Sequence, residues 1–347
     1  MKKPFVIVLM AAASAGLGAQ TKAIFYMTAR PESVRSFLAH AEKIDILIPE
    51  IYSADGEGVV WGAPDPQVLE TAQKQGVPVM PIIVNPGFKQ ETIHALLASR
   101  EAQNRLSNTL LEECQRYKYY GIQFDFENVP FSDRDALTGL VRDTAALLGR
   151  YGYKLSIATV HKSSDYPGRG DYAHWIYTNW RGAYDLPEIA KSVEFISVMA
   201  YDQHTGHTPP GPVAGFPWVQ EVLDYSLKVI PKEKISLGIP LYGRRWYAGT
   251  REKDAVTLIA SVNAPEALDL ASQMKVTPRW DPQERAPWFY FYRDGVREYV
   301  FYNDVRAFRD RYQLARQNGL HSFSSWVLGA EDPEVWKELP VVHPGAR

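Results

Sequence analysis

Residues 120–130 read Tyr-Gly-Ile-Gln-Phe-Asp-Phe-Glu-Asn-Val-Pro, and apolar and polar side chains alternate from Ile122 to Glu127. A period of two is that of a β-strand, whose successive side chains point to opposite faces. Gln123, Asp125 and Glu127 therefore share one face, and the apolar residues between them share the other. This pattern suits a barrel strand, whose apolar face packs against outer helices while its polar face lines the interior.

The rest of the chain alternates short, β-rich apolar runs with longer amphipathic segments, as repeated βα units do. Eight strands are predicted, at 23–27, 44–48, 77–84, 121–126, 154–159, 195–200, 234–239 and 321–326. Helices are expected between them, including 33–41, 67–75, 133–150, 217–229 and 304–318. Eight strands with helical returns predict an α/β fold, the (β/α)8 or TIM barrel.

Residues 246–300 break this rhythm after the seventh strand. They combine aromatic clusters, a hairpin turn signal at Arg293-Asp-Gly and a helical stretch at 265–274. We predict a small α+β insertion, whose aromatic residues form either its own core or contacts with a ligand. The expected organisation is a leader at 1–20 and one barrel domain at 21–347 that includes the insertion.

The leader has the features of an export signal: Lys2 and Lys3, an apolar stretch at 5–13, and small residues up to Ala19. The apolar stretch is well short of the roughly 20 residues that a membrane-spanning helix needs. We therefore expect cleavage near residue 20, no membrane span in the mature chain, and a secreted or periplasmic protein.

Composition narrows the possible partners. The 347-residue chain has a net charge of -2 with scattered basic residues, so it lacks the electrostatic signature of nucleic-acid binding. Cys114 is the only cysteine, which excludes an intramolecular disulfide and predicts a buried thiol.

His204 and His207 lie in a Pro-rich loop with only Asp202 nearby, so a metal site is not expected there. No cofactor is expected either. We expect a monomer that acts on a small or neutral polymeric ligand.

The two carboxylates of residues 120–130 carry the chemistry. Burying acids two residues apart is costly unless they share a proton or are hydrogen-bonded, and their repulsion should hold one of them protonated near neutral pH. A poised proton donor is what glycosidic bond cleavage requires. The alternative is structural, with Asp125 and Glu127 capping a helix or pairing with basic residues at the surface.

This segment resembles the fourth barrel strand of glycoside hydrolase family 18, which carries Asp-x-x-Asp-x-Asp-x-Glu. The chain matches at Gly121, Asp125 and Glu127 and departs at the first two acidic positions, where Tyr120 and Gln123 stand. The last Asp and the Glu are the working pair of that family, so the departure does not predict inactivity. It does predict a less strongly coupled acid pair, with Gln123 able to hydrogen-bond Asp125.

Three more segments are similar to the same family in the same order: 198–204 to its strand six, 237–243 to its strand seven and 319–326 to its strand eight. The similarity extends from about residue 24 to residue 336. Within the family, the Phe126-Glu-Asn-Val-Pro130 ending looks most like bacterial cell-wall and spore-cortex lytic glucosaminidases.

The resemblance implies roles for individual residues. Glu127 would be the proton donor, with Asp125 and Tyr201 acting on the acetamido group of an N-acetylglucosamine-containing glycan. Trp326 would stack on a sugar ring, supported at or near the strand ends by Tyr26, Asn85, Gln123, Met199, Asp202 and Tyr242, for which core packing is the alternative role. A non-catalytic carbohydrate-binding lectin on the same barrel is the competing function. Peptidoglycan, chitin and N-linked glycans all stay open as ligands.

Overall fold

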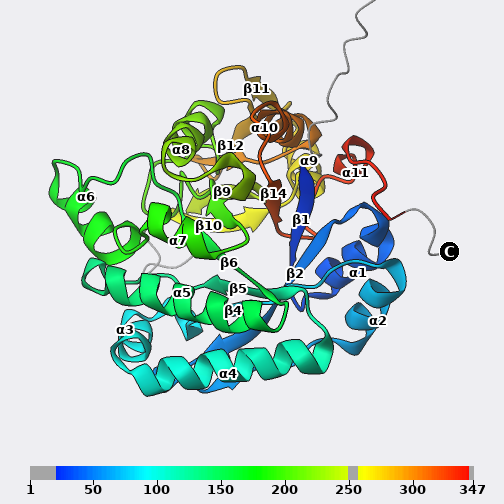
Figure 1. The fold of residues 1–347 in the computed structure, drawn as a ribbon. Coiled ribbons are helices and arrows are strands. Elements are labelled where there is room, and N and C mark those ends of the chain that lie inside the picture. Colours follow the sequence, from blue (N-terminus) through cyan, green and yellow to red (C-terminus); the bar gives the residue numbers. More distant parts are fainter. Residues whose placement is uncertain (1–20, 249–256, 344–347) are drawn as a thin grey trace, which may run out of the picture.

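The computed structural model describes residues 21–248 and 257–343, and Figure 1 shows its ribbon. Eight parallel strands close into a barrel, because β1 pairs with β14 on one side and with β2 on the other. The barrel strands are β1 Lys22–Met27, β2 Ile46–Ala54, β4 Ile82–Val84, β5 Gly121–Asp125, β6 Lys154–Val160, β7 Ile196–Met199, β8 Ile235–Pro240 and β14 Ser322–Trp326. The predicted (β/α)8 barrel is confirmed. The expected export signal at 1–20 lies outside the described residues.

Helices return the chain between the strands and surround the barrel (Figure 1). They are α1 Pro31–His40, α2 Pro66–Gln75, α3 Gln90–Ala98, α4 Arg100–Tyr117, α5 Arg134–Arg150, α6 Asp171–Ile176, α7 Leu186–Ser192, α8 Phe216–Val229, α10 Val305–Gln317 and α11 Val335–Glu338. Local sequence sets their ends, as α2 illustrates. The Asp65 side chain accepts hydrogen bonds from the backbone of the first turn, and Gly76 ends the helix in the left-handed conformation.

Two strand predictions were wrong at their ends. The second strand was expected at 44–48, but β2 runs through Pro49 to Ala54 and shifts register at Glu50. The third was expected at 77–84, but β4 is limited to Ile82–Val84. Pro78 and Pro81 lack the N–H groups that a continuous ladder needs there, and residue 79 forms only an isolated bridge to Leu47.

The barrel has separate inner and outer cores, as the alternation along the strands requires. The inner cluster is formed by Ile24, Tyr26, Ile46, Ile48, Met80, Ile82 and Phe195. Ile122, Phe124 and Phe126 belong instead to the outer cluster, between the strands and the helices. The predicted facing of residues 121–127 is therefore correct, and the polar set of β5 points into the barrel.

Between β8 and α10 the chain forms a second, antiparallel sheet in the order β10-β9-β13-β12-β11. Its elements are β9 Gly243–Ala248, β10 Thr257–Val262, α9 Ala264–Gln273, β11 Arg279–Asp281, β12 Ala286–Arg293 and β13 Val296–Phe301. The sheet begins three residues before the predicted 246. The hairpin turn is confirmed, since Asp294 and Gly295 both have positive φ. Phe289, Phe291 and Val300 pack against α9, so these aromatic residues form the insertion's own core.

The structure also describes Cys114, the loop of His204, and the residue types that could hold a metal ion or span a membrane. Cys114 is a buried free thiol, and burial raises its pKa to about 12. His204 Nδ1 donates to the Pro209 carbonyl at 2.9 Å. Within the two described ranges, no three His, Cys, Asp or Glu side chains gather to hold a metal ion. In the same ranges, no helix is both long and apolar enough to cross a bilayer.

Candidate active site

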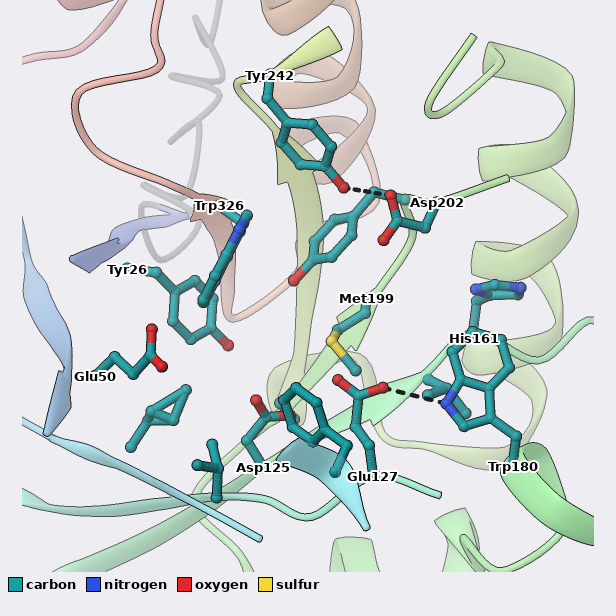
Figure 2. Close-up of a pocket in the computed structure, with 16 residues that line it drawn as sticks. Tyr26, Glu50, Asp125, Glu127, His161, Trp180, Met199, Asp202, Tyr242 and Trp326 are labelled. Carbon is teal, nitrogen blue, oxygen red and sulfur yellow. Dashed lines mark hydrogen bonds between the residues drawn. The ribbon is translucent and has the colours of Figure 1, made fainter. Parts of the chain in front are cut away.

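One cavity opens at the carboxyl ends of the barrel strands, where TIM-barrel active sites lie. Eight of the ten predicted site residues line it: Tyr26, Asp125, Glu127, Met199, Tyr201, Asp202, Tyr242 and Trp326. Figure 2 shows Asp125 and Glu127 on one side of this space and Tyr242 and Asp202 on the other, with the Trp326 ring beside Tyr26. Asn85 and Gln123 do not line the cavity and lie behind its wall.

Strand β5, which leads to both acids, packs closely against β6. A Cβ atom on Gly121 would lie 2.0 Å from the Lys154 carbonyl oxygen, so only glycine permits this approach. Every residue of β5 is buried. Asp125 ends the strand and Glu127 follows two residues later, which keeps both side chains on the inner face.

Two side chains, those of Asn85 and Trp180, hold Glu127 through three hydrogen bonds. The Asn85 side chain accepts from its backbone N–H at 3.1 Å and donates to its carbonyl at 3.0 Å. The Trp180 indole Nε1 donates to Glu127 Oε2 at 3.1 Å (Figure 2). Burial and the charge of Asp202 raise the Glu127 pKa, while the Trp180 hydrogen bond partly opposes that rise. The side chain is thus held in place as a weak acid.

Asp125 lacks comparable partners. Its Oδ1 is buried without a hydrogen-bond partner among the described residues. Burial, followed by the charges of Glu127 and Glu50, raises the Asp125 pKa well above its usual range. The expectation that one member of the acid pair stays protonated near neutral pH agrees with this direction.

The expected hydrogen bond from Gln123 to Asp125 is a wrong prediction. Gln123 is fully buried below the cavity, where its oxygen accepts from the Tyr26 hydroxyl at 2.7 Å. Its nitrogen donates to the hydroxyls of Ser156 at 2.9 Å and Ser197 at 3.3 Å. The amide group is thus fully used by β1, β6 and β7, and it connects three strands under the site.

Tyr201 reaches the cavity from the end of β7. A Cβ atom on Gly238 would lie 3.0 Å from the Tyr201 ring, so the glycine leaves room for the ring on β8. Burial first, and then the nearby tyrosines and acids, raise the Tyr201 pKa well above its ordinary value. Its hydroxyl is therefore a neutral group that can donate a hydrogen bond.

Asp202 is occupied by other partners. The Tyr242 hydroxyl donates to Asp202 Oδ1 at 2.5 Å (Figure 2), and the Arg244 guanidinium forms an ion pair with the same oxygen.

Trp326 ends β14, and the peptide bond that follows it is cis. Its ring centroid lies 5.3 Å from that of Tyr26.

Eight residues that line the cavity were missed from the sequence: the polar or aromatic Glu50, Phe88, His161 and Trp180, and the aliphatic Ile82, Val84, Ala158 and Val160. Glu50 follows Ile46 and Ile48 on the inner face of β2, so a longer predicted strand would have revealed it. Trp180 lies in η4 (Tyr177–Arg181), a π-helical turn that no simple periodicity marks. Its ring packs edge-on against His161, with the centroids 5.8 Å apart. Burial and the Arg181 charge lower the His161 pKa to about 3, so this imidazole is neutral.

Comparison with known proteins decides the family. The profile described as "Glycosyl hydrolases family 18" matches residues 51–331, which is most of the chain. The chain belongs to glycosyl hydrolase family 18. The family assignment from the four sequence segments is thereby confirmed.

Relatives within family 18 include bacterial spore proteins. A putative sporulation-specific glycosylase of Bacillus subtilis is 27% identical over 312 residues, which cover 88% of this chain and 70% of that protein. The cortical fragment-lytic enzyme of Bacillus subtilis is 28% identical over 290 residues, and the match spans 82% of this chain and 64% of the enzyme.

Solved structures share the fold. The spore cortex-lytic enzyme SleL of Bacillus cereus superimposes with a TM-score of 0.81 at 24% identity, over 91% of this chain and 73% of that one. A chitinase from Chromobacterium violaceum gives a TM-score of 0.82 at 23% identity, over 92% and 97% of the two chains.

Proposed function

We propose that this protein is a retaining glycosidase that cleaves β-1,4-linked N-acetylglucosamine-containing glycans of the peptidoglycan or chitin type. One observation carries the proposal: Glu127, Asp125 and Tyr201 line a single cavity beside the flat ring of Trp326. The names of the Bacillus relatives, a glycosylase and a cortical fragment-lytic enzyme, support a cell-wall glycan as the substrate.

Glu127 serves as general acid and then as general base. Its raised pKa favours the protonated form that donates to the leaving glycosidic oxygen. The resulting carboxylate then takes a proton from the water that completes hydrolysis. The Asn85 side chain holds the Glu127 backbone in place, and the Trp180 hydrogen bond positions the carboxyl group.

The 2-acetamido oxygen of the substrate acts as the nucleophile, so the mechanism needs no second nucleophilic carboxylate. Asp125 accepts the acetamido N–H and stabilises the positive charge that develops on the ring formed with the anomeric carbon. The Tyr201 hydroxyl donates to the acetamido oxygen and holds it beneath that carbon. Asp125 reaches the cavity from β5 and Tyr201 from the end of β7, with β6 between those two strands.

Trp326 completes the sugar site by offering a flat apolar face to a pyranose ring, next to Tyr26. The neutral glycan agrees with the small net charge of the chain. Such a substrate lies outside the cytoplasm, so export directed by residues 1–20 is part of the same proposal.

The deciding experiment compares the wild-type protein with Glu127→Gln on peptidoglycan sacculi and on chitin oligomers, with products identified by mass spectrometry. We expect wild type to release N-acetylglucosamine-terminated fragments and the variant to release none while still binding the glycan. Binding by wild type with no cleavage of either substrate would favour the lectin function instead.

A further inference from the structure

The segment between β6 and β7 exposes aromatic rings outside the cavity. Tyr172 and Trp175 of α6 are 65% and 58% exposed, and their rings stack with centroids 6.4 Å and planes 18° apart. Tyr166, on the loop before α6, is 60% exposed. Single exposed apolar side chains are ordinary, whereas two stacked rings offer a contiguous apolar face that a ligand can cover. We refer to Tyr172 and Trp175 as the α6 surface.

The α6 surface is continuous with the wall of the cavity. Helix α6 runs directly into η4, which holds Trp180 against Glu127. The Asn179 side chain donates to the Trp175 carbonyl at 2.9 Å. The stacked rings thus lie on the same short helical segment as Trp180, which donates a hydrogen bond to the proposed acid. Figure 1 shows α6 at the edge of the molecule.

A second contact fixes this segment beside the acid. The Gln90 side chain donates to the Asn128 carbonyl at 3.0 Å and to the Asn179 carbonyl at 3.4 Å. Asn128 directly follows Glu127 in the chain. The segment that carries Trp175 is therefore anchored on the side of the cavity where Glu127 and Trp180 lie.

Charge beside the α6 surface is balanced, since Arg169 just before the helix and Asp171 at its first position carry opposite signs, and Asp165 of the preceding loop is paired. Asp165 forms ion pairs with Lys162 at 2.6 Å and with Arg134 at 3.0 Å. The Tyr177 hydroxyl also donates to Asp165, at 3.2 Å. What is left for a ligand is flat aromatic area with little net charge. That chemistry fits the C–H faces of neutral sugar rings better than it fits an anionic polymer or membrane.

We propose that the α6 surface binds the glycan chain beyond the cavity, on the leaving-group side of Glu127. The inference rests on the proposed function, because Glu127 protonates the oxygen that joins the sugar in the cavity to the next sugar. The chain must leave the cavity past Glu127 and Trp180, and α6 continues from that wall. A long substrate would therefore lie across Tyr172 and Trp175, whereas a short one would end before them.

The test uses the full chain with Tyr172→Ala, Trp175→Ala and the double variant, each with and without Glu127→Gln. Tyr151→Ala is the matched control, because Tyr151 is 57% exposed at the far end of α5. The inactive proteins are assayed for binding to insoluble chitin and to sacculi, and the active ones for hydrolysis of those polymers and of chitotriose. Trp175→Phe, which keeps a stacking ring, tests the chemistry of the contact.

We expect the double variant to bind polymer about ten-fold more weakly, with kcat/KM on chitotriose changed less than about two-fold. Trp175→Phe should keep most of the binding, and Tyr151→Ala all of it. Unchanged polymer binding in the double variant would refute the role of the α6 surface in binding. If Glu127→Gln still abolishes cleavage, the proposed function stands. Equal losses on polymer and trimer would also refute it, since α6 would then act only through Trp180. If wild type neither binds nor cleaves any glycan, the proposed function fails and this inference fails with it.

Discussion

Replacing Trp180 by Phe should move the alkaline limb of the pH–rate profile to higher pH. The indole Nε1 donates to Glu127 Oε2 at 3.1 Å, and its ring packs edge-on against His161. Phenylalanine keeps an aromatic ring at this position but has no donor. The substitution therefore removes one hydrogen bond from the proposed acid with little loss of packing.

The size of the effect follows from the difference between two hydrogen bonds. A bond to an ionised carboxylate is worth about 1.5–3 kcal/mol, and one between neutral groups about 0.5–1.5 kcal/mol. The donor therefore favours the ionised form by about 1–1.5 kcal/mol, and 1.36 kcal/mol corresponds to one pKa unit. Since this bond lowers the Glu127 pKa, losing it raises the pKa and keeps the acid protonated to higher pH. We expect the limb to move up by about one pH unit.

The assay is kcat against pH on a soluble N-acetylglucosamine oligomer, because kcat reports the ionisations of the enzyme–substrate complex, in which Glu127 carries the proton. Trp218→Phe is the matched control. The Trp218 ring centroid lies 4.7 Å from that of His161, and Trp218 is not among the residues lining the cavity. A limb that stays in place in Trp180→Phe, or moves to lower pH, would refute the assigned role of the indole. So would an equal movement in Trp218→Phe.

Three further changes test the remaining acids and the tyrosine. Asp125→Asn should abolish hydrolysis yet raise the melting temperature at neutral pH, because burial raises the Asp125 pKa and its ionisation costs folding free energy. That gain should vanish below about pH 4, where the wild-type carboxyl is protonated in both the folded and unfolded chains; a gain that does not depend on pH contradicts the argument. Glu50→Gln removes a negative charge that raises the Asp125 pKa, so the acidic limb of kcat should move to lower pH, and an unmoved limb means that Glu50 does not act on Asp125. Tyr201→Phe should lower kcat by about 10²-fold with a much smaller change in KM, and the reverse pattern would indicate simple substrate binding.

The fold was predictable because alternation along a strand is a local property. Residues 122–127 alternate strictly, and the structure puts the polar members inside the barrel and the apolar ones against the helices. Strand ends were less predictable, since β2 continues through Pro49 by pairing with β3 (Val60–Trp61) and β4. β4 is remote in sequence, and β3 pairs only with Ser53 and Ala54, so no extended local pattern indicates either pairing.

The site was predictable where its residues lie on barrel strands or within three residues of a strand end. Tyr26, Asp125, Met199 and Trp326 all belong to strand segments whose facing can be counted. Trp180 could not be found in this way, because a π-helical turn between α6 and α7 carries it to the mouth. Gln123 was assigned the wrong partner for a related reason. Its position in the chain places it below Asp125, but the groups that compete for its amide come from three other strands.

Four carboxylates line the cavity at the barrel mouth, those of Glu50, Asp125, Glu127 and Asp202. The groups that contact each of them determine which acid holds a shared proton. Asp202 is held by Arg244 and Tyr242, whereas Glu127 receives the Trp180 donor and Asp125 Oδ1 receives none. Adjacent buried acids cannot both ionise cheaply, so a proton stays within the Asp125 and Glu127 pair. The indole stabilises charge on Glu127, which favours the proton on Asp125 in the free protein.

On the proposed mechanism, substrate binding reverses this preference. The acetamido N–H supplies the donor that Asp125 Oδ1 lacks, and a donor favours the ionised form of the acid that it reaches. The proton then belongs on Glu127, where the leaving oxygen can take it. The unpartnered oxygen of Asp125 thus couples the protonation of Glu127 to the binding of a 2-acetamido sugar. A glycan without that group would leave Glu127 without its proton.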